Sequence, residues 1–138
     1  MNERFLVDTS VWIEALRPGG RQDVTTWLKE ALLREAVVLV PPVKTEILIG
    51  AKNEKQFAEL NELLNTLPLL NSESAVWERA AALGFRFRRR GLVIPLVDLA
   101  IASWAICCSC VLVHRDRHYD LIAGELPEQK FLSFTERN

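Results

Sequence analysis

Residues 4–10, with the sequence RFLVDTS, decide the fold, because a short apolar run ends there in a carboxylate and two hydroxyls. The apolar residues 5–7 predict a buried strand. Thr9 and Ser10 are side chains of the kind that cap helices, so a helix is expected directly after the strand. A buried strand that passes at once into a helix is typical of α/β folds with a parallel sheet.

The rest of the chain continues this alternation. Further short apolar runs predict strands at residues 37–40, 67–70, 111–113 and 130–132. Helices are predicted at residues 11–16, 23–35, 41–49, 57–64, 72–90, 98–109 and 119–124. The segment 67–70 is expected at the sheet edge, because Pro68 has no N–H to donate to a central ladder. We expect one domain over residues 1–138, a three-layer α/β/α structure with a central parallel sheet of about five short strands.

The composition is that of an ordinary globular protein, with 138 residues, 49% hydrophobic and 25% charged. The net charge of −1 argues against a protein that coats nucleic acid, since such proteins show a broad basic surface. A nuclease does not need that surface, because a bound divalent metal ion supplies positive charge where the phosphate lies.

The three cysteines, within residues 107–110, predict a cytoplasmic protein. They are too closely clustered for a secreted disulfide framework, and residues 5–7 are too short an apolar run for a signal peptide. The spacing C-C-x-C matches no common zinc signature, even with His114 and His118 nearby, so the thiols are expected to pack in the core.

The apolar stretch 92–113 is long enough to resemble a membrane span. Pro95 and Asp98 interrupt it, and a carboxylate within a bilayer is costly. We therefore expect no membrane segment here but a loop, a buried helix and a buried strand in succession.

Four carboxylates lie near the ends of predicted elements, and in parallel α/β folds ligands bind at the carboxyl ends of the strands. The four candidate residues are Asp8, Glu46, Asp98 and Asp116. Each alone has a structural explanation: a helix cap for the first and third, a solvated helix face for the second, a turn for the fourth. The joint pattern favours a site.

Asp8 and Asp98 carry the strongest physical case, because both are embedded in apolar sequence without a neighbouring Lys or Arg. A hard divalent cation such as Mg²⁺ would compensate these charges and favours oxygen ligands. Crowded carboxylates repel one another, so at least one pKa is predicted to be raised. The residues thus indicate metal-assisted phosphodiester chemistry, with Ser10 as either a helix cap or a hydroxyl that orients a ligand.

The only dense basic run consists of Arg86, Arg88, Arg89 and Arg90. It has two interpretations. Basic side chains at a helix C-terminus are favoured by the macrodipole and can simply be solvated. Alternatively, the run binds phosphates of a nucleic acid near the site.

Four segments together resemble the PIN domain, and in detail the VapC toxins of toxin–antitoxin pairs. These are LVDTSVWI (6–13), TEILIG (45–50), VDLAIA (97–102) and RDRHY (115–119). The resemblance implies an endoribonuclease that uses Mg²⁺ or Mn²⁺, a homodimer, RNA as substrate, and a VapB-type antitoxin that blocks the active site. By position, the family's acidic residues correspond to Asp8, Glu46, Asp98 and Asp116.

Two departures from the family pattern concern histidines. His114 stands where the family often has Thr, which leaves open whether a hydroxyl helps to hold Asp116. His118 stands where a fifth acid sometimes occurs, which indicates four acids rather than five.

Other function classes fit less well. A phosphatase of the aspartyl-phosphate type needs a second Asp two residues after the first, where this chain has Ser10, and a receiver domain needs an acidic pair there. A PIN-like nuclease of RNA processing and a non-catalytic RNA- or protein-binding module remain alternatives.

Overall fold

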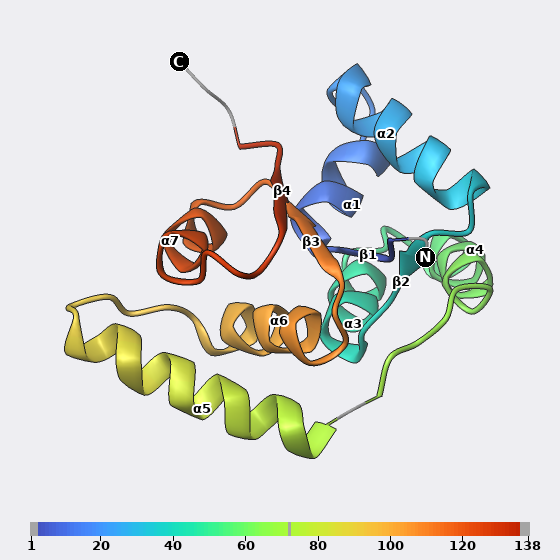
Figure 1. Cartoon of the computed structure of the whole chain (residues 1–138). Helices are drawn as coiled ribbons and strands as arrows, with labels where there is room; N and C mark the ends of the chain where they lie inside the picture. Colours follow the sequence, from blue (N-terminus) through green and yellow to red (C-terminus); the bar gives the residue numbers. More distant parts are fainter. Residues whose placement is uncertain (1–2, 72, 136–138) are drawn as a thin grey trace.

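The computed structural model describes residues 3–71 and 73–135 (Figure 1). The four strands found there are β1 (Phe5–Val7), β2 (Val37–Val38), β3 (Val111–His114) and β4 (Phe131–Ser133). The helices are α1 (Thr9–Leu16), α2 (Gln22–Leu33), α3 (Pro41–Ile49), α4 (Glu54–Leu64), α5 (Glu73–Arg89), α6 (Leu96–Cys107) and α7 (Arg117–Glu125). The expected start of the fifth long helix at Ser72 lies outside the described residues.

The strands form one parallel sheet in the order β2-β1-β3-β4. The register pairs Phe5 with both Val37 and Val111, while Val113 pairs with Leu132. Parallel neighbours require crossover connections, and Figure 1 shows α1 and α2 on one side of the sheet with α5 and α6 on the other. The predicted fold class is therefore confirmed.

The sheet is smaller than expected, with four strands among the described residues instead of about five. The segment 67–70 makes only an isolated parallel bridge, between Leu39 and Leu69. Leu39 donates its N–H to the Pro68 carbonyl at 2.9 Å, and the Leu70 N–H donates to the Leu39 carbonyl at 2.8 Å. Since Pro68 has no N–H, the pairing does not extend into a ladder.

Helix α6 forms the centre of the core, because it lies between the sheet and α5. All seven residues from Leu99 to Ala105 are buried. None of the helices in the described parts of the chain is long and apolar enough to cross a membrane. The predicted core packing of the thiols holds for Cys110, which is buried, and for Cys108, which is half-buried against the core, whereas Cys107 at the end of α6 is exposed.

The carboxyl ends of β1 and β3 lie side by side, because the two strands pair in parallel. The pairing continues one residue further, since the Asp8 N–H donates to the Val113 carbonyl at 2.8 Å. Residues that directly follow these two strands therefore meet at one edge of the sheet, where ligands bind in such folds.

Candidate active site

Asp8 is fixed by both of its carboxylate oxygens. Oδ2 accepts hydrogen bonds from the Ser10 N–H at 3.0 Å and from the Ser10 hydroxyl at 2.6 Å, so Asp8 caps α1. Oδ1 accepts a bond from the Tyr119 hydroxyl at 2.9 Å. Only 5% of Asp8 is exposed. Ser10 does not itself cap the helix; its hydroxyl orients the carboxylate that does.

Asp98 lies in the first turn of α6 and makes no cap bond, because the N-cap residue is Pro95. The structural explanation that Asp98 caps a helix is therefore wrong. Its Oδ2 lies 2.9 Å from His118 Nδ1. Its Oδ1 accepts a longer bond, of 3.4 Å, from the Tyr119 hydroxyl that also binds Asp8.

The Asp98 carboxylate lies in an environment that disfavours its charge. Burial, followed by the charges of Asp116 and Asp8, raises its pKa to about 6, and the contact with His118 offsets only part of this effect. One pKa of the cluster is thus raised, as the sequence predicts, with burial as the larger cause and the crowding of carboxylates as the smaller one. The cluster is therefore short of positive charge.

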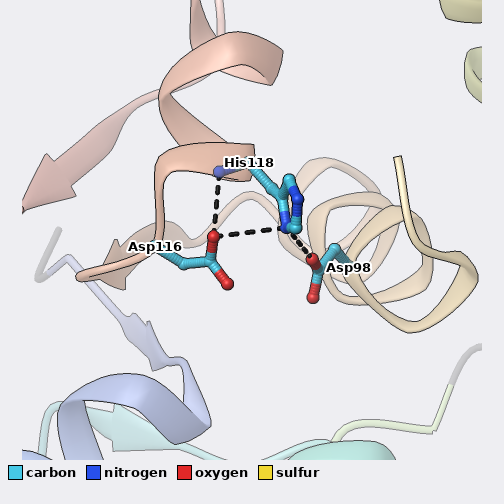
Figure 2. A group of neighbouring side chains, drawn as sticks. All are labelled: Asp98, Asp116 and His118. Atoms are coloured by element: carbon cyan, nitrogen blue, oxygen red, sulfur yellow. Dashed lines mark hydrogen bonds and ion pairs between the residues drawn. The ribbon is translucent and has the colours of Figure 1, made fainter. Parts of the chain in front are cut away.

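Asp116 caps α7, because its Oδ1 accepts the His118 N–H at 2.9 Å. The same oxygen lies 3.3 Å from His118 Nδ1 (Figure 2). The N–H of Asp116 donates to Nδ1 of His114, at 3.2 Å. His114 is fully buried, and burial lowers its pKa, so the neutral ring can accept this bond. The histidine at the position of the family's Thr thus holds the backbone that carries Asp116.

Glu46 is the most exposed of the four acids and lies on α3. Its Oε1 accepts a hydrogen bond from the Thr9 hydroxyl at 2.8 Å. Because Thr9 directly follows Asp8, this bond ties Glu46 to the same edge of the sheet. The structure thus links Asp8, Asp98 and Asp116 closely and attaches Glu46 through Thr9.

Three neighbours contact the acids in a way that the sequence did not predict: Thr9, His118 and Tyr119. Tyr119 is fully buried, and burial together with the Asp8 and Asp98 charges raises the pKa of its hydroxyl. It therefore stays a hydrogen-bond donor. The only signal for Tyr119 was its position three residues after Asp116, which does not distinguish it from an ordinary core aromatic.

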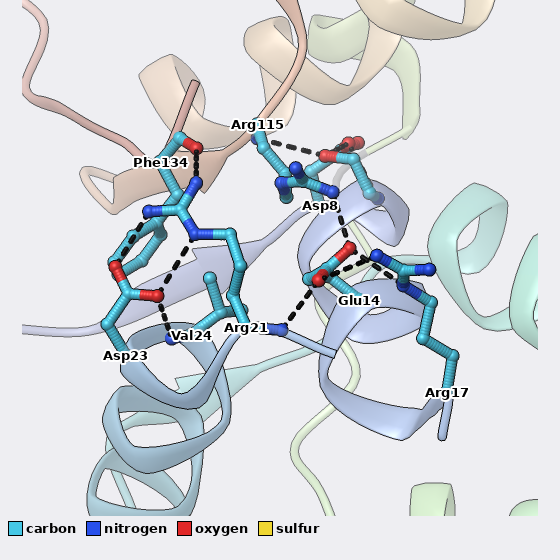
Figure 3. Close-up of polar contacts among 9 residues, drawn as sticks. Asp8, Glu14, Arg17, Arg21, Asp23, Val24, Arg115 and Phe134 are labelled. Atoms are coloured by element: carbon cyan, nitrogen blue, oxygen red, sulfur yellow. Dashed lines mark hydrogen bonds and ion pairs between the residues drawn. The ribbon is translucent and has the colours of Figure 1, made fainter. Parts of the chain in front are cut away.

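A second charged cluster surrounds Glu14 in α1 (Figure 3). Only 2% of its side chain is exposed. The carboxylate accepts bonds from Arg17 Nε and Nη2 at 2.9 and 3.1 Å, from the Arg21 N–H at 2.7 Å and from Arg115 Nη1 at 2.6 Å. Hydrogen bonding by Arg17 is the largest of the effects that lower the pKa of Glu14.

The Glu14 cluster is joined to the site through backbone. The N–H of Arg115 donates to the Ser10 hydroxyl at 3.0 Å, and that hydroxyl donates to Asp8. The cluster therefore anchors the loop between β3 and α7, which carries Asp116.

Two arginines of the basic run contact Glu125 at the C-terminal end of α7, whereas Asp116 lies at the N-terminal end of that helix. Arg86 donates to the Glu125 carbonyl at 3.0 Å, and Arg90 forms an ion pair with the Glu125 carboxylate. Arg89 lies over the Phe85 ring, at 5.7 Å from its centroid. Since α7 extends from residue 117 to Glu125, its length of about 13 Å separates these contacts from Asp116.

The donor set fits a divalent cation. Asp98, Asp116 and His118 each offer one ligand atom, and these atoms all lie within 4.8 Å of one another. Carboxylate oxygens suit hard divalent ions, and imidazole suits transition metals. A bound cation would also relieve the repulsion that raises the pKa of Asp98 to about 6. No cysteine belongs to this group, which is the one found in the described part of the chain.

Comparisons with known proteins identify the family of the chain. The family model for the PIN domain matches residues 5–125. The chain belongs to the PIN domain family. It is 37% identical over 124 residues to the VapC ribonuclease of Mycobacterium bovis and to ribonuclease VapC11 of Mycobacterium tuberculosis, covering 86% of this chain and 91% of each relative. The resemblance found in the sequence is thus confirmed.

Solved structures share the fold of this PIN domain. FitAcB from Neisseria gonorrhoeae has a TM-score of 0.72 and 24% identity, over 93% of this chain and 96% of that one. VapBC2 from Rickettsia felis, bound to a promoter DNA fragment, has a TM-score of 0.76 and 19% identity, over 94% and 98%. A toxin–antitoxin complex from Klebsiella pneumoniae has a TM-score of 0.64 and 22% identity, over 80% and 85%.

Proposed function

We propose that this chain is a metal-dependent endoribonuclease and the toxin of a toxin–antitoxin pair. One observation carries the proposal: a carboxylate cluster short of positive charge lies at the carboxyl ends of β1 and β3, in a chain 37% identical to VapC ribonucleases. We take residues 1–138 as one nuclease domain, located in the cytoplasm. The residues proposed as catalytic and metal-binding are Asp8, Glu46, Asp98 and Asp116.

The proposed cofactor is Mg²⁺ or Mn²⁺, held by carboxylates of this set. When bound, such an ion polarises the scissile phosphodiester, activates a water and stabilises the departing 3′ oxygen. Asp98 and Asp116 are the carboxylates whose oxygens already lie within 4.8 Å of one another. Asp8 adjoins them through the Tyr119 hydroxyl.

The chain's own contribution is to orient the carboxylates with neutral donors. The Ser10 and Tyr119 hydroxyls each bind one oxygen of Asp8, and the Thr9 hydroxyl binds Glu46. A neutral donor fixes the direction of a carboxylate without cancelling its charge. The negative charge therefore remains available to a cation, whereas a guanidinium in the same place would neutralise it.

RNA is the proposed substrate, and a VapB-type antitoxin and a second copy of this chain are the proposed partners. The ribonuclease relatives support the substrate, and the toxin–antitoxin complexes of the same fold support the antitoxin. The homodimer rests on the resemblance to VapC toxins.

The proposal is tested by incubating the purified chain with a mixed RNA pool. Cleavage is expected with Mg²⁺ or Mn²⁺ and is expected to disappear with EDTA and in the Asp98→Asn variant. Glu78→Gln, an exposed acid on α5, is the matched control and should cleave normally. RNA that is bound but stays intact with either metal would indicate a non-catalytic module instead.

The toxin role needs a separate measurement. Induced expression is expected to arrest growth of the host cell, and the Asp98→Asn variant should not. Robust RNA cleavage in vitro without growth arrest would favour a nuclease of RNA processing. Sequencing the 5′ ends of the products would then identify the cleaved site.

A further inference from the structure

His118 places a ring nitrogen among the carboxylates of the site (Figure 2). Its Nδ1 lies 2.9 Å from Asp98 Oδ2 and 3.3 Å from Asp116 Oδ1. The imidazole therefore faces the same space as the two carboxylates, although 43% of the side chain remains exposed. A position where the family sometimes carries an acid thus carries a nitrogen donor in this chain.

The backbone on both sides of this imidazole is fixed. The His118 N–H is bound by the Asp116 cap at 2.9 Å, which sets the first turn of α7. The following residue, Tyr119, is fully buried and donates to Asp8 at 2.9 Å. The backbone that carries the imidazole is therefore fixed by the start of α7.

We propose that His118 is a metal ligand together with Asp98 and Asp116, and that this nitrogen makes the site select Mn²⁺ and other first-row transition ions over Mg²⁺. The inference rests on the proposed function, because it concerns the same metal. Mg²⁺ prefers oxygen ligands and keeps its waters, whereas imidazole nitrogen binds first-row transition ions well. Ligation through Nδ1 leaves the proton of the neutral ring on Nε2.

Charge strengthens the same preference. Because the imidazole of His118 is neutral, a ligand set that contains it holds a divalent ion with one negative charge fewer than the same set with a carboxylate at position 118. Mg²⁺ depends on that electrostatic attraction more than a transition ion does, since its bonds to ligands are the least covalent. The exchange of an acid for His118 therefore weakens Mg²⁺ more than Mn²⁺.

The direct test is spectroscopic and uses the intact wild-type chain with Mn²⁺ alone. Pulsed electron paramagnetic resonance should detect a ¹⁴N nucleus coupled to the bound Mn²⁺, and ¹⁵N-histidine labelling should change that signal. No variant is needed, so failure to fold cannot obscure the result. A Mn²⁺ site without nitrogen coupling would overturn the proposal.

Calorimetric titrations with MnCl₂, CoCl₂ and MgCl₂ supply the second test. His118→Ala should weaken Mn²⁺ and Co²⁺ binding roughly 10–100-fold, the range seen when groups that support a metal site are removed. His118→Asp should shift the preference back towards Mg²⁺. The matched control is Arg117→Ala, an exposed neighbour in the same helical turn, which should keep the wild-type order.

Failure of this inference differs from failure of the proposed function. If the wild type binds Mn²⁺ and cleaves RNA but His118→Ala leaves the Mn²⁺ to Mg²⁺ affinity ratio unchanged, His118 is not a ligand and the nuclease stands. If the wild type binds no divalent ion and cleaves no RNA, both proposals fall.

Discussion

Glu14 in α1 and Asp98 in α6 both bring carboxylates into mostly buried positions, with 2% and 17% of their side chains exposed. Their neighbours are opposite in charge. Glu14 is surrounded by Arg17, Arg115 and the Arg21 backbone, which together lower its pKa. Asp98 is surrounded by two other acids, and with burial they raise its pKa to about 6.

The difference distinguishes a carboxylate that holds the fold together from one that awaits a ligand. A buried charge is costly unless it is paired, and the chain supplies the partner for Glu14 from its own arginines. Beside Asp98 it supplies a histidine and a tyrosine hydroxyl. The repulsion and burial at Asp98 lower the stability of the metal-free protein, and a bound cation would offset that loss.

The largest effect is expected from Asp98→Asn, which should reduce cleavage at least about 100-fold, because a metal ligand is lost. The metal-free variant should be more stable than the wild type by about 1 kcal/mol at pH 7, because it lacks a carboxyl whose pKa burial raises to about 6 and whose charge solvent partly screens. Unfolding by urea in EDTA measures this difference.

The pH dependence of that difference follows from the sign of the shift. The unfolded Asp98 ionises near its ordinary value of 3.8, whereas the folded one stays protonated up to about 6. Between these values the folded state holds a proton that the unfolded state has lost, so the stability of the wild type falls as pH rises. The difference in stability between the variant and the wild type should therefore grow over the same interval. A metal-free variant less stable than the wild type would make Asp98 a structural residue.

Glu14→Gln should have the opposite effect on stability. Removing this charge leaves the guanidinium groups of Arg17 and Arg115 without their buried partner, so the melting temperature should fall by several degrees. The folded pKa of Glu14 is lowered, so its contribution is present above the ordinary value of 4.5 and is lost as pH falls through the folded pKa.

Thermal melts between pH 3 and 8 test this prediction. Asp23→Asn is the matched control, because that acid pairs with Arg21 but 54% of its side chain is exposed, and exposed ion pairs contribute little. Equal losses in the two variants would remove the contrast between the clusters.

Tyr119→Phe removes the hydroxyl that binds Asp8 and Asp98 and keeps the aromatic ring in the core. Asp8 loses its 2.9 Å bond and Asp98 its 3.4 Å bond, so metal affinity should fall by about 10-fold. Titration with MnCl₂ followed by calorimetry measures the change. An unchanged affinity would show that the hydroxyl does not orient the carboxylates.

The smallest effect is expected from the double charge reversal of Arg88 and Arg89 to Glu. Unlike the arginines at Glu14, these two lie at the exposed end of α5. If they bind phosphates, the slope of log affinity against log salt for an RNA oligonucleotide should fall by about 0.7 per contact. Metal affinity should not change, and Arg34→Glu, exposed at the end of α2, is the control. Binding unaltered at every salt concentration would make the run structural.

The strand ends and the candidate acids could be proposed from the sequence. Short apolar runs that end at Asp8 and shortly before Asp116 predicted the edge of the sheet, and the apolar surroundings of Asp8 and Asp98 made these two the strongest candidates. Glu46 and Asp116 rested more on topology and family position. The predicted fifth strand, at residues 67–70, forms only an isolated bridge, because Pro68 has no N–H with which to extend a ladder. Asp98 was expected to open its helix, yet α6 begins two residues earlier at Leu96.

The roles of Glu14, His118 and Tyr119 were decided only by the tertiary structure. Glu14 meets Arg115 across 101 residues, and Tyr119 meets Asp8 across 111. Local patterns such as hydrophobic period and capping residues depend on neighbours in the chain, so by themselves they determine strands, helices and the acids at their ends. Which carboxylate receives a guanidinium and which is left with other acids depends on strand order and crossover, which bring distant side chains together.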